Sequence, residues 1–436
     1  MRTQFTPLQL GDPQTAVSAA AIRACVHCGF CNAACPTFQL LGDERDGPRG
    51  RIRIIQDMLE DGGAPSAEAV RHIDRCLSCL GCKSACPSGV DYMHLVDHAR
   101  EHIAQHHRRG WGEGLLRLSL RTVLMRPWLF RLALSMARGA RFLKGSLPPE
   151  LARLLSLAEG AAQEPLPRPR VYPAMGARRM RVALLEGCVQ AVMAPQINRA
   201  AIRVLNRMGV EVVTVAGASC CGAIALHLGA RADSRRFAMR NIAVWSREKE
   251  THGLDAIVVT MSGCGVQVKD YGHLFRDDPQ WRAPAASVSA LSVDVMALIQ
   301  RLDTPLPKVA EPMRVAYHAA CSLQHGQGLP GIGERLLARA GFEVVSPQGA
   351  HLCCGAAGTY HVLQAEIADG LKARKAEAIR ATGAQVLAGG NFGCLHFLKD
   401  VAGMPCVHSV ELIDFAGGGP RPFDARMPLH LPLVGG

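Results

Sequence analysis

The chain has 436 residues, a formal net charge of +12 and 17 cysteines. Its length allows about three domains of ordinary size, and an apolar share of 48% with 20% charged residues excludes a disordered or fibrous protein. Residues 1–14 lack the apolar stretch of an export signal, so we expect a cytoplasmic protein whose cysteines stay reduced and free to bind metal.

The first feature along the chain is a cysteine pattern that occurs twice, in residues 25–36 and 76–87. Each copy reads C-x2-C-x2-C-x3-C-P, the spacing that bacterial ferredoxins use for two iron-sulfur clusters. Three close cysteines grip one cluster, and the fourth, set off by a proline turn, faces the other. A zinc site or a disulfide framework explains the third cysteine and the repeated C-P pair less well. The pattern predicts two crossed 4Fe-4S sites, with Cys25, Cys28, Cys31 and Cys86 at cluster 1 and Cys76, Cys79, Cys82 and Cys35 at cluster 2.

A mixed-charge segment separates the two copies. Arg45, Arg49 and Arg51 stand there among the acidic residues Asp43, Glu44 and Asp46. This composition fits either a docking surface for a partner subunit or a solvated loop with internal salt bridges. His27, inside the first cysteine loop, is a candidate for tuning a cluster without binding it.

Residues 100–145 form a basic segment with ten Lys or Arg and two Glu, a net charge of +8. Its pattern predicts one or two helices broken at Pro127, with arginines among leucines and aromatic residues. It lacks the run of about 18 apolar residues that a membrane-spanning helix needs. Two interpretations remain open: peripheral contact with an anionic membrane or a partner subunit, or a linker packed on its own domains with solvated arginines. No nucleic-acid motif accompanies the charge, so we expect no nucleic-acid partner.

A second repeat follows the three prolines of residues 164–170. In both copies a Cys-Cys-Gly motif begins 32 positions after a first cysteine, and a fourth cysteine follows 43 positions after the pair in one copy and 40 in the other. Equal spacing over such distances indicates a duplicated module. The cysteines are Cys188, Cys220, Cys221 and Cys264 in the first copy and Cys321, Cys353, Cys354 and Cys394 in the second.

Strands and helices alternate in both copies, which predicts α/β modules with mainly parallel sheets. The expected strands are 181–185, 210–215 and 256–260, then 314–317, 342–345 and 385–387; the expected helices are 196–208 and 232–249, then 333–340 and 361–381. The cysteines follow strand ends, where the loops of such sheets converge. We therefore expect a mostly α-helical ferredoxin-type domain at 1–99, a basic helical linker at 100–175, α/β modules at 176–305 and 311–418, and a tail at 419–436.

Several local motifs resemble a known family. Besides the cysteine loops, these are residues 41–44 (LGDE), 46–51 (DGPRGR), 185–188 (LEGC), 262–265 (SGCG) and 351–355 (HLCCG). The repeats resemble the cysteine-rich domains of heterodisulfide reductases, and the whole chain is similar to the iron-sulfur subunits of glycolate oxidase. The resemblance implies that a separate FAD-containing subunit oxidises glycolate to glyoxylate, beside a further flavoprotein-like subunit. This chain would pass the electrons to quinone or another membrane acceptor at the cytoplasmic face of the inner membrane, with no catalytic residue of its own.

The role of the repeat cysteines stays open at this point. Heterodisulfide reductase modules with an unusual cluster end in C-x-x-C, whereas Gln267 and Phe397 occupy the last position here. The eight repeat cysteines are candidate additional metal ligands for a further cluster, redox thiols or buried small residues. His318 and His351, near repeat cysteines, are candidate ligands. The alternative functions are electron transfer for glycerol-3-phosphate or lactate oxidation, and thiol-disulfide chemistry at the paired cysteines.

Overall fold

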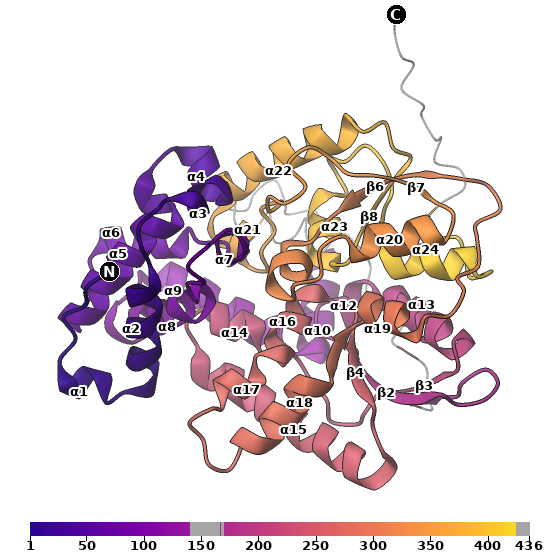
Figure 1. Ribbon diagram of the computed structural model, residues 1–436, viewed down its shortest axis with the longest axis horizontal. Coiled ribbons are helices and arrows are strands. Elements are labelled where there is room, and N and C mark those ends of the chain that lie inside the picture. The colour runs from indigo at the N-terminus through magenta and orange to yellow at the C-terminus, as the bar shows by residue number, and fades with distance from the viewer. Residues whose placement is uncertain (140–165, 167–169, 424–436) are drawn as a thin grey trace, which may run out of the picture.

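The computed structural model describes residues 1–139, 166 and 170–423. A helical N-terminal domain lies beside two α/β modules, and two further helices connect them (Figure 1). Most of the proline-rich boundary at 164–170, the basic residues Arg141 and Lys144, and residues 424–436 of the expected tail lie outside the described residues.

The N-terminal domain is built from short helices that begin at favourable capping positions. Proline occupies the first turn of α2, α4 and α5, and the side chains of Asp12 and Ser66 accept hydrogen bonds from the first turns of α2 and α6. Ile22, Ile55 and Leu95 are fully buried where α2, α5 and α8 pack together. Helix α8 crosses the expected boundary between residues 99 and 100. The elements are α1 (Pro7–Leu10), α2 (Pro13–Ala24), α3 (Phe30–Ala33), α4 (Pro36–Leu41), η1 (Glu44–Asp46), α5 (Pro48–Asp61), α6 (Ala67–Asp74), α7 (Gly81–Ser84) and α8 (Tyr92–His106).

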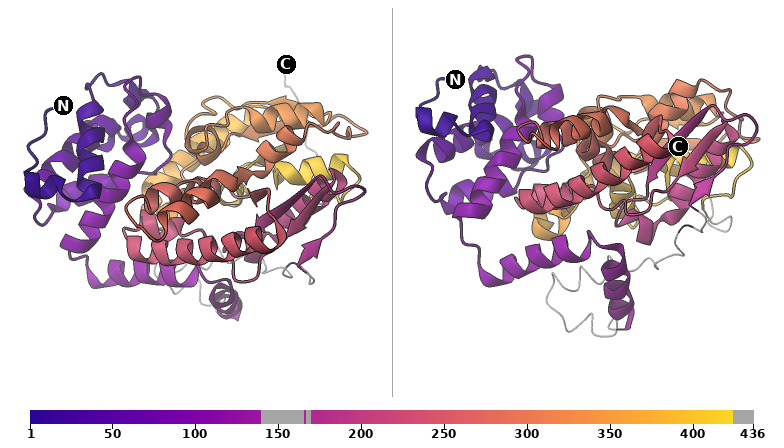
Figure 2. Two further views of the ribbon diagram at one scale, coloured as in Figure 1. Left: turned by 60° about the horizontal axis from the view of Figure 1, so that its bottom comes forward. Right: turned by 90° about the horizontal axis from the view of Figure 1, so that it is seen from below.

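The basic segment forms two helices, α9 (Trp111–Val123) and α10 (Pro127–Gly139), with the break at Pro127 as predicted. They lie along one edge of the molecule (Figure 2). Some of the arginines are not solvated charges: Arg100 is buried, and Arg109 and Arg117 pair with Asp74 at 2.6 and 2.9 Å. The segment is thus anchored to the N-terminal domain by part of its own charge. Within the described residues, none of the helices has both the length and the hydropathy to cross a membrane.

The first α/β module forms a five-stranded sheet in the order β1-β3-β2-β4-β5, in which only β1, contributed by the segment before residue 176, runs antiparallel. This confirms the mainly parallel sheet. The strands are β1 (Val171–Tyr172), β2 (Met180–Leu185), β3 (Val210–Val213), β4 (Ala256–Val259) and β5 (Ser292–Asp294). The helices are α12 (Gln190–Met193), α13 (Pro195–Arg207), α14 (Ala223–His227), α15 (Arg231–His252), α16 (Ser262–Lys269), α17 (Tyr271–Leu274), α18 (Arg282–Leu291) and α19 (Val295–Leu302).

The second α/β module repeats this plan with a parallel sheet in the order β7-β6-β8-β9. The strands are β6 (Arg314–His318), β7 (Glu343–Val345), β8 (Val386–Gly389) and β9 (Cys406–His408). A π-helical turn, η3 (Ser322–Gly326), follows β6, and the helices are α20 (Ile332–Arg339), α21 (Tyr360–Leu363), α22 (Ala365–Arg380), α23 (Phe392–Leu398) and α24 (Ser409–Ala416).

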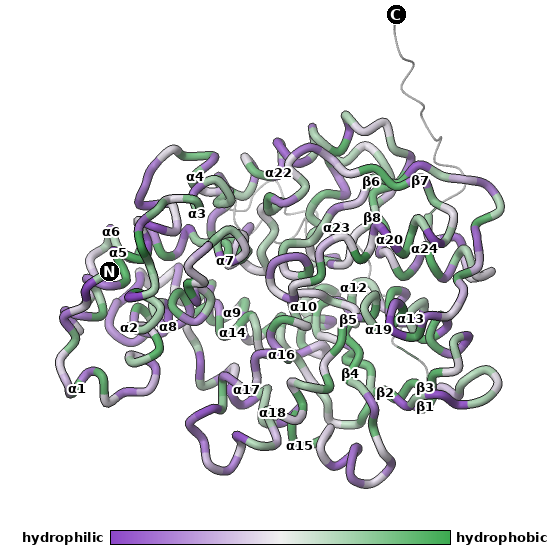
Figure 3. The backbone as a smooth tube through the Cα atoms, viewed as in Figure 1, coloured by the Kyte–Doolittle hydropathy of each residue, from purple (hydrophilic) through white to green (hydrophobic). Residues whose placement is uncertain are grey.

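One hydrophobic core joins the two modules. Leu184 and Val258 of the first sheet belong to the same buried cluster as Tyr317 and Ala388 of the second. The green colour of β4 and β6 in Figure 3 marks these apolar strands. Near the strand ends, Ser262 Oγ lies 2.7 Å from Ser322 Oγ, so loops that follow strands of the two sheets also meet.

Candidate metal centres

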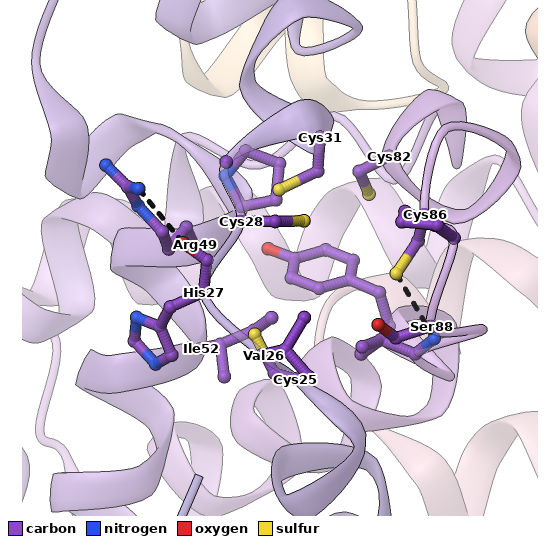
Figure 4. Close-up of a pocket in the computed structure, with 15 residues that line it drawn as sticks. Cys25, Val26, His27, Cys28, Cys31, Arg49, Ile52, Cys82, Cys86 and Ser88 are labelled. Atoms are coloured by element: carbon purple, nitrogen blue, oxygen red, sulfur yellow. Dashed lines mark hydrogen bonds between the residues drawn. The ribbon is translucent and has the colours of Figure 1, made fainter.

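The first cysteine set surrounds a single open pocket of about 430 Å³ (Figure 4). Cys25 ends α2, Cys28 lies in the following loop and Cys31 lies in α3. The loop turns through left-handed backbone at His27 and Gly29, with φ of 58° and 83°. Cys86, more than fifty residues further along the chain, lines the same pocket. The structure therefore brings together the four cysteines predicted for cluster 1.

The second set lines a neighbouring pocket of about 310 Å³, formed by Cys35, Cys76, Cys79 and Cys82. Its loop turns through left-handed backbone at Ser78 and Leu80. The fourth cysteine of each sequence copy thus lies with the first three of the other, which is the crossed arrangement. Cys82 borders both pockets, so the two sites are adjacent.

Three thiols in these pockets, those of Cys31, Cys79 and Cys82, are hard to ionise without a nearby cation. Burial and neighbouring thiols raise the pKa of Cys79 and of Cys82 well above the ordinary value. Burial, followed by the nearby Cys25, raises the pKa of Cys31 to about 11. Two sets of four converging thiols are the ligand set of 4Fe-4S clusters, so the residues present fit two such groups.

A buried polar network supports the second pocket. Arg51 Nη1 lies 3.9 Å from Cys35 Sγ, and Arg51 also donates to Thr37 Oγ1 at 3.2 Å and to the His72 carbonyl at 2.8 Å. Asp46 accepts from Arg51, His72 and Arg75. Tyr92 donates its hydroxyl to Cys76 Sγ at 3.8 Å. Thr37 and Tyr92 were not singled out from the sequence, although Thr37 directly follows the Cys35-Pro36 pair.

This network changes the interpretation of the mixed-charge segment. Arg45 and Arg49 lie at the surface, paired with Asp43 at 2.8 Å and Glu44 at 2.6 Å. Arg51, in contrast, is 1% exposed, so it cannot take part in a docking surface. It faces inward because α5 presents it together with Ile52 and Ile55 to the domain core. His27 lies at the rim of the first pocket and is mostly exposed. Partial desolvation of its ring and the nearby positive amino terminus lower its pKa.

The repeat cysteines also converge, as the strand-end pattern predicted. Cys188 and Cys220 have their Sγ atoms 3.5 Å apart, and Cys321 and Cys353 have theirs 3.9 Å apart. Cys221 contacts Cys264, and Cys354 contacts Cys394.

The glycine after each cysteine pair is required by the backbone. Gly222 and Gly355 have φ of 93° and 95°, and a Cβ on Gly355 would lie 2.7 Å from the Ala368 carbonyl oxygen. This explains the Cys-Cys-Gly motif.

The two repeat sites differ in their position relative to the N-terminal domain. Leu77 and Cys79, from the second ferredoxin-type loop, pack in the same apolar cluster as the cysteines of the second module. The contact is fixed by hydrogen bonds from Tyr360 Oη to the Arg75 carbonyl (3.0 Å) and between His325 Nδ1 and Ser84 Oγ (2.9 Å). The cysteines of the first module belong to a separate cluster. No sequence pattern links residue 79 to residue 321, so this contact could not be foreseen.

The two candidate histidines have different surroundings. His318 lies within 4.8 Å of Cys354 and Cys394, measured between potential ligand atoms. His351 is exposed and belongs to none of the ligand groups found among the described residues. The structure thus brings only His318 to the repeat cysteines.

Comparison with known families agrees with this arrangement. Residues 21–90 match the 4Fe-4S dicluster domain, and residues 182–269 and 315–399 each match the cysteine-rich domain. A crystal structure of a hypothetical protein from Helicobacter pylori has the same fold, with a TM-score of 0.54 and 10% sequence identity over 94% of this chain and 73% of that chain.

Two relatives of known designation cover most of the chain, and a third covers half of it. The glycolate oxidase iron-sulfur subunit of Escherichia coli (strain K12) is 38% identical over 418 residues, which is 95% of this chain and 99% of that protein. A probable glycolate oxidase iron-sulfur subunit of Bacillus subtilis (strain 168) is 29% identical over 86% of this chain and 88% of its own length. Lactate utilization protein A of Bacillus subtilis (strain 168) is 29% identical over 50% of this chain and 89% of its own length. The chain therefore belongs to the family of glycolate oxidase iron-sulfur subunits and is an electron-transfer protein with 4Fe-4S clusters.

Proposed function

We propose that this chain accepts electrons from an FAD-containing subunit that oxidises glycolate to glyoxylate and delivers them to quinone or another membrane acceptor. The observation that carries the proposal is the pair of adjacent thiol pockets, one bordered by the exposed Cys28 and one lined by Cys79, which packs against the second module. When bound, the two 4Fe-4S clusters supply one-electron carriers. We further propose a second flavoprotein-like subunit in the complex.

The ligand assignment follows the pockets. Cys25, Cys28, Cys31 and Cys86 would hold the outer cluster, and Cys35, Cys76, Cys79 and Cys82 the inner one. The protein contributes fixed positions for these thiols, a buried cation beside Cys35, and the apolar surroundings of Leu77. We also propose metal binding or redox chemistry for the repeat cysteines, because four thiols converge in each module.

The rim of the outer pocket suits a protein partner. Val26 and Phe30 are 67% and 66% exposed beside Cys28, and Arg49 lines the same pocket. Exposed apolar side chains with adjacent positive charge favour docking of an acidic, partly apolar surface. We propose that the FAD-containing subunit docks here.

The exposed side of α9 and α10 supports peripheral membrane contact. Trp111, Leu115 and Leu118 recur at helical spacing on α9 and are 85%, 48% and 47% exposed. On α10 the exposed apolar residues are Trp128, Leu132 and Met136. The exposed arginines Arg108, Arg126 and Arg138 accompany them, a combination that favours an anionic bilayer surface at the cytoplasmic face of the membrane.

The test is anaerobic co-purification followed by substrate addition. A stable complex with a flavoprotein, whose iron-sulfur absorption bleaches when glycolate is added, supports the proposal. Bleaching by lactate or by glycerol-3-phosphate but not by glycolate refutes the substrate assignment. Of these two alternatives, lactate is favoured by a specific observation, the similarity of half the chain to lactate utilization protein A.

A further inference from the structure

His318 is a buried imidazole whose surroundings contain sulfur rather than oxygen. It ends β6, is 2% exposed, and neither ring nitrogen has an oxygen or nitrogen partner within the described part of the chain. One ring nitrogen and the Sγ atoms of Cys354 and Cys394 all lie within 4.8 Å of one another. A buried polar side chain without such a partner is costly, so this arrangement points to a missing ligand.

The first module lacks this nitrogen at the corresponding position. His318 precedes Cys321 by three residues and pairs with Gly389, five residues before Cys394. Leu185 has the same relation to Cys188, and it pairs with Val259, five residues before Cys264. Leu185 is 3% exposed and packs in the apolar core. The two copies thus differ at one buried position by an imidazole in place of an isobutyl group.

A second difference adds a positive charge to the same module. A Cβ on Gly355 would meet Cα of Ala368, and a Cβ on Gly222 would meet Cα of Ser234, each at 3.3 Å, so these positions correspond. Lys375 lies seven residues after Ala368 in the second module, and Asn241 lies seven residues after Ser234 in the first. Lys375 is 5% exposed, donates to the Gly349 carbonyl at 2.8 Å, and interacts electrostatically with the four repeat cysteines.

The spacing of these donors suits a single ion. A tetrahedral zinc ion with bonds of about 2.0–2.3 Å places its ligand atoms roughly 3.5–3.8 Å apart, and the ligand atoms of His318, Cys354 and Cys394 already lie within 4.8 Å of one another. Zinc is commonly bound by such mixtures of imidazole and thiolate. Three thiolates, one neutral imidazole and Zn²⁺ carry a net charge of −1, and a lysine beside such a site would stabilise it when protonated.

We propose that the second module binds one zinc ion through His318, Cys354 and Cys394, with the fourth ligand from the neighbouring Cys321–Cys353 pair, and that the first module does not. This inference rests on the metal binding or redox chemistry proposed above for the repeat cysteines, and it specifies metal binding for the second module. It does not depend on which substrate the FAD-containing subunit oxidises. Because zinc does not change its oxidation state, the ion would stabilise the wall that covers the inner cluster pocket and would not carry electrons.

The experiment measures zinc and iron in the anaerobically purified full-length chain by inductively coupled plasma mass spectrometry. The expected wild-type result is about one zinc and about eight irons per chain, the irons being those of two 4Fe-4S clusters. His318→Leu, which installs the residue of the first module, is expected to lose zinc at least tenfold and to keep its iron. Cys394→Ser is expected to lose zinc as well, whereas Cys264→Ser, the corresponding change in the first module, is expected to keep both metals.

Three results would overturn the proposal: wild-type protein without zinc, unchanged zinc in His318→Leu, or about twelve irons in the wild type that fall to about eight in that variant. If His318→Leu does not fold, the role of His318 is tested instead with the His318→Cys variant, in which cobalt replaces zinc and the absorption spectrum is measured. Replacing nitrogen by a fourth thiolate should strengthen the thiolate-to-cobalt absorption, and an unchanged spectrum would exclude His318 as a ligand. Failure of glycolate to bleach the clusters, with zinc present, would refute only the proposed function.

Discussion

Replacing Arg51 by methionine should lower the reduction potential of the inner cluster. The guanidinium is 1% exposed and lies 3.9 Å from Cys35 Sγ. Burial opposes its charge, but the neighbouring Cys76, Tyr92, Cys35 and Asp46 raise its pKa, so it stays protonated. A fixed positive charge beside the cluster favours the added electron, and methionine removes that charge while keeping an apolar side chain of similar length.

The magnitude follows from the distance. Two unit charges 3.9 Å apart interact by about 4 kcal/mol at an effective dielectric constant of about 20. The added electron is shared by the whole cluster, so we take about half, roughly 2 kcal/mol, which is about 85 mV for one electron. Asp46 keeps its bonds from His72 and Arg75, so we expect the variant to fold with reduced stability.

The assay is a redox titration monitored by electron paramagnetic resonance on protein with full iron content. Arg53→Met is the matched control, because Arg53 lies on the same helix with its side chain 60% exposed. Arg51→Lys should give a smaller decrease, since it keeps the charge without the fork geometry. An inner-cluster potential within about 20 mV of wild type, or an increase, would refute the reasoning.

Three further predictions test the ligand sets, an interface and a turn. Cys86→Ser should remove the cluster held by the Cys25 trio, leaving about four irons and one resonance signal; loss of the Cys76 trio's cluster would contradict the crossed assignment. His94 bonds Asp91 and Asp270 and, although burial lowers its pKa, these partners raise that pKa to about 9. Its stabilisation should be complete below about pH 6.5 and disappear as the pH rises through about 9, so the melting temperature should fall over this range in wild type but not in His94→Gln; parallel curves would disprove the link. Gly355→Ala should destabilise the chain by about 1–3 kcal/mol in thermal unfolding, more than Gly358→Ala, whose Cβ would meet nothing within 4 Å; equal effects would argue against the close contact with Ala368.

The arrangement of the cysteines was predictable because it depends on spacing. The interval between the third and fourth cysteines and the following proline determine where the fourth thiol points, so the two sets in the pockets match the sequence. The repeat predicted the strands that precede Cys188 and Cys321 in the same way. Residue spacing and hydrophobic periodicity can be read directly from the sequence, so the features that depend on them could be predicted.

Features that depend on packing between distant segments could not be predicted. The charged neighbours of Arg51 in the sequence suggested a surface loop. In the structure Arg51 is buried against Thr37 and His72, which lie elsewhere in the chain and gave no sign of this contact. The strands β5 and β9 are only three residues long and contain polar side chains, so they are too short for an alternating or apolar pattern to identify them. Their hydrogen bonds to β4 and β8 make them strands.

The crossed pockets have a consequence for the synthesis of the protein. A ribosome releases Cys25, Cys28 and Cys31 long before Cys86, which lines the same pocket. During that interval the emerging segment has only three of the four thiols of its site, and Cys35 has none of its partners until the loop that begins at Cys76 has been made. Cluster insertion should therefore occur once for both sites, after residue 86 has emerged, and a nascent chain that stalls earlier should hold neither cluster stably.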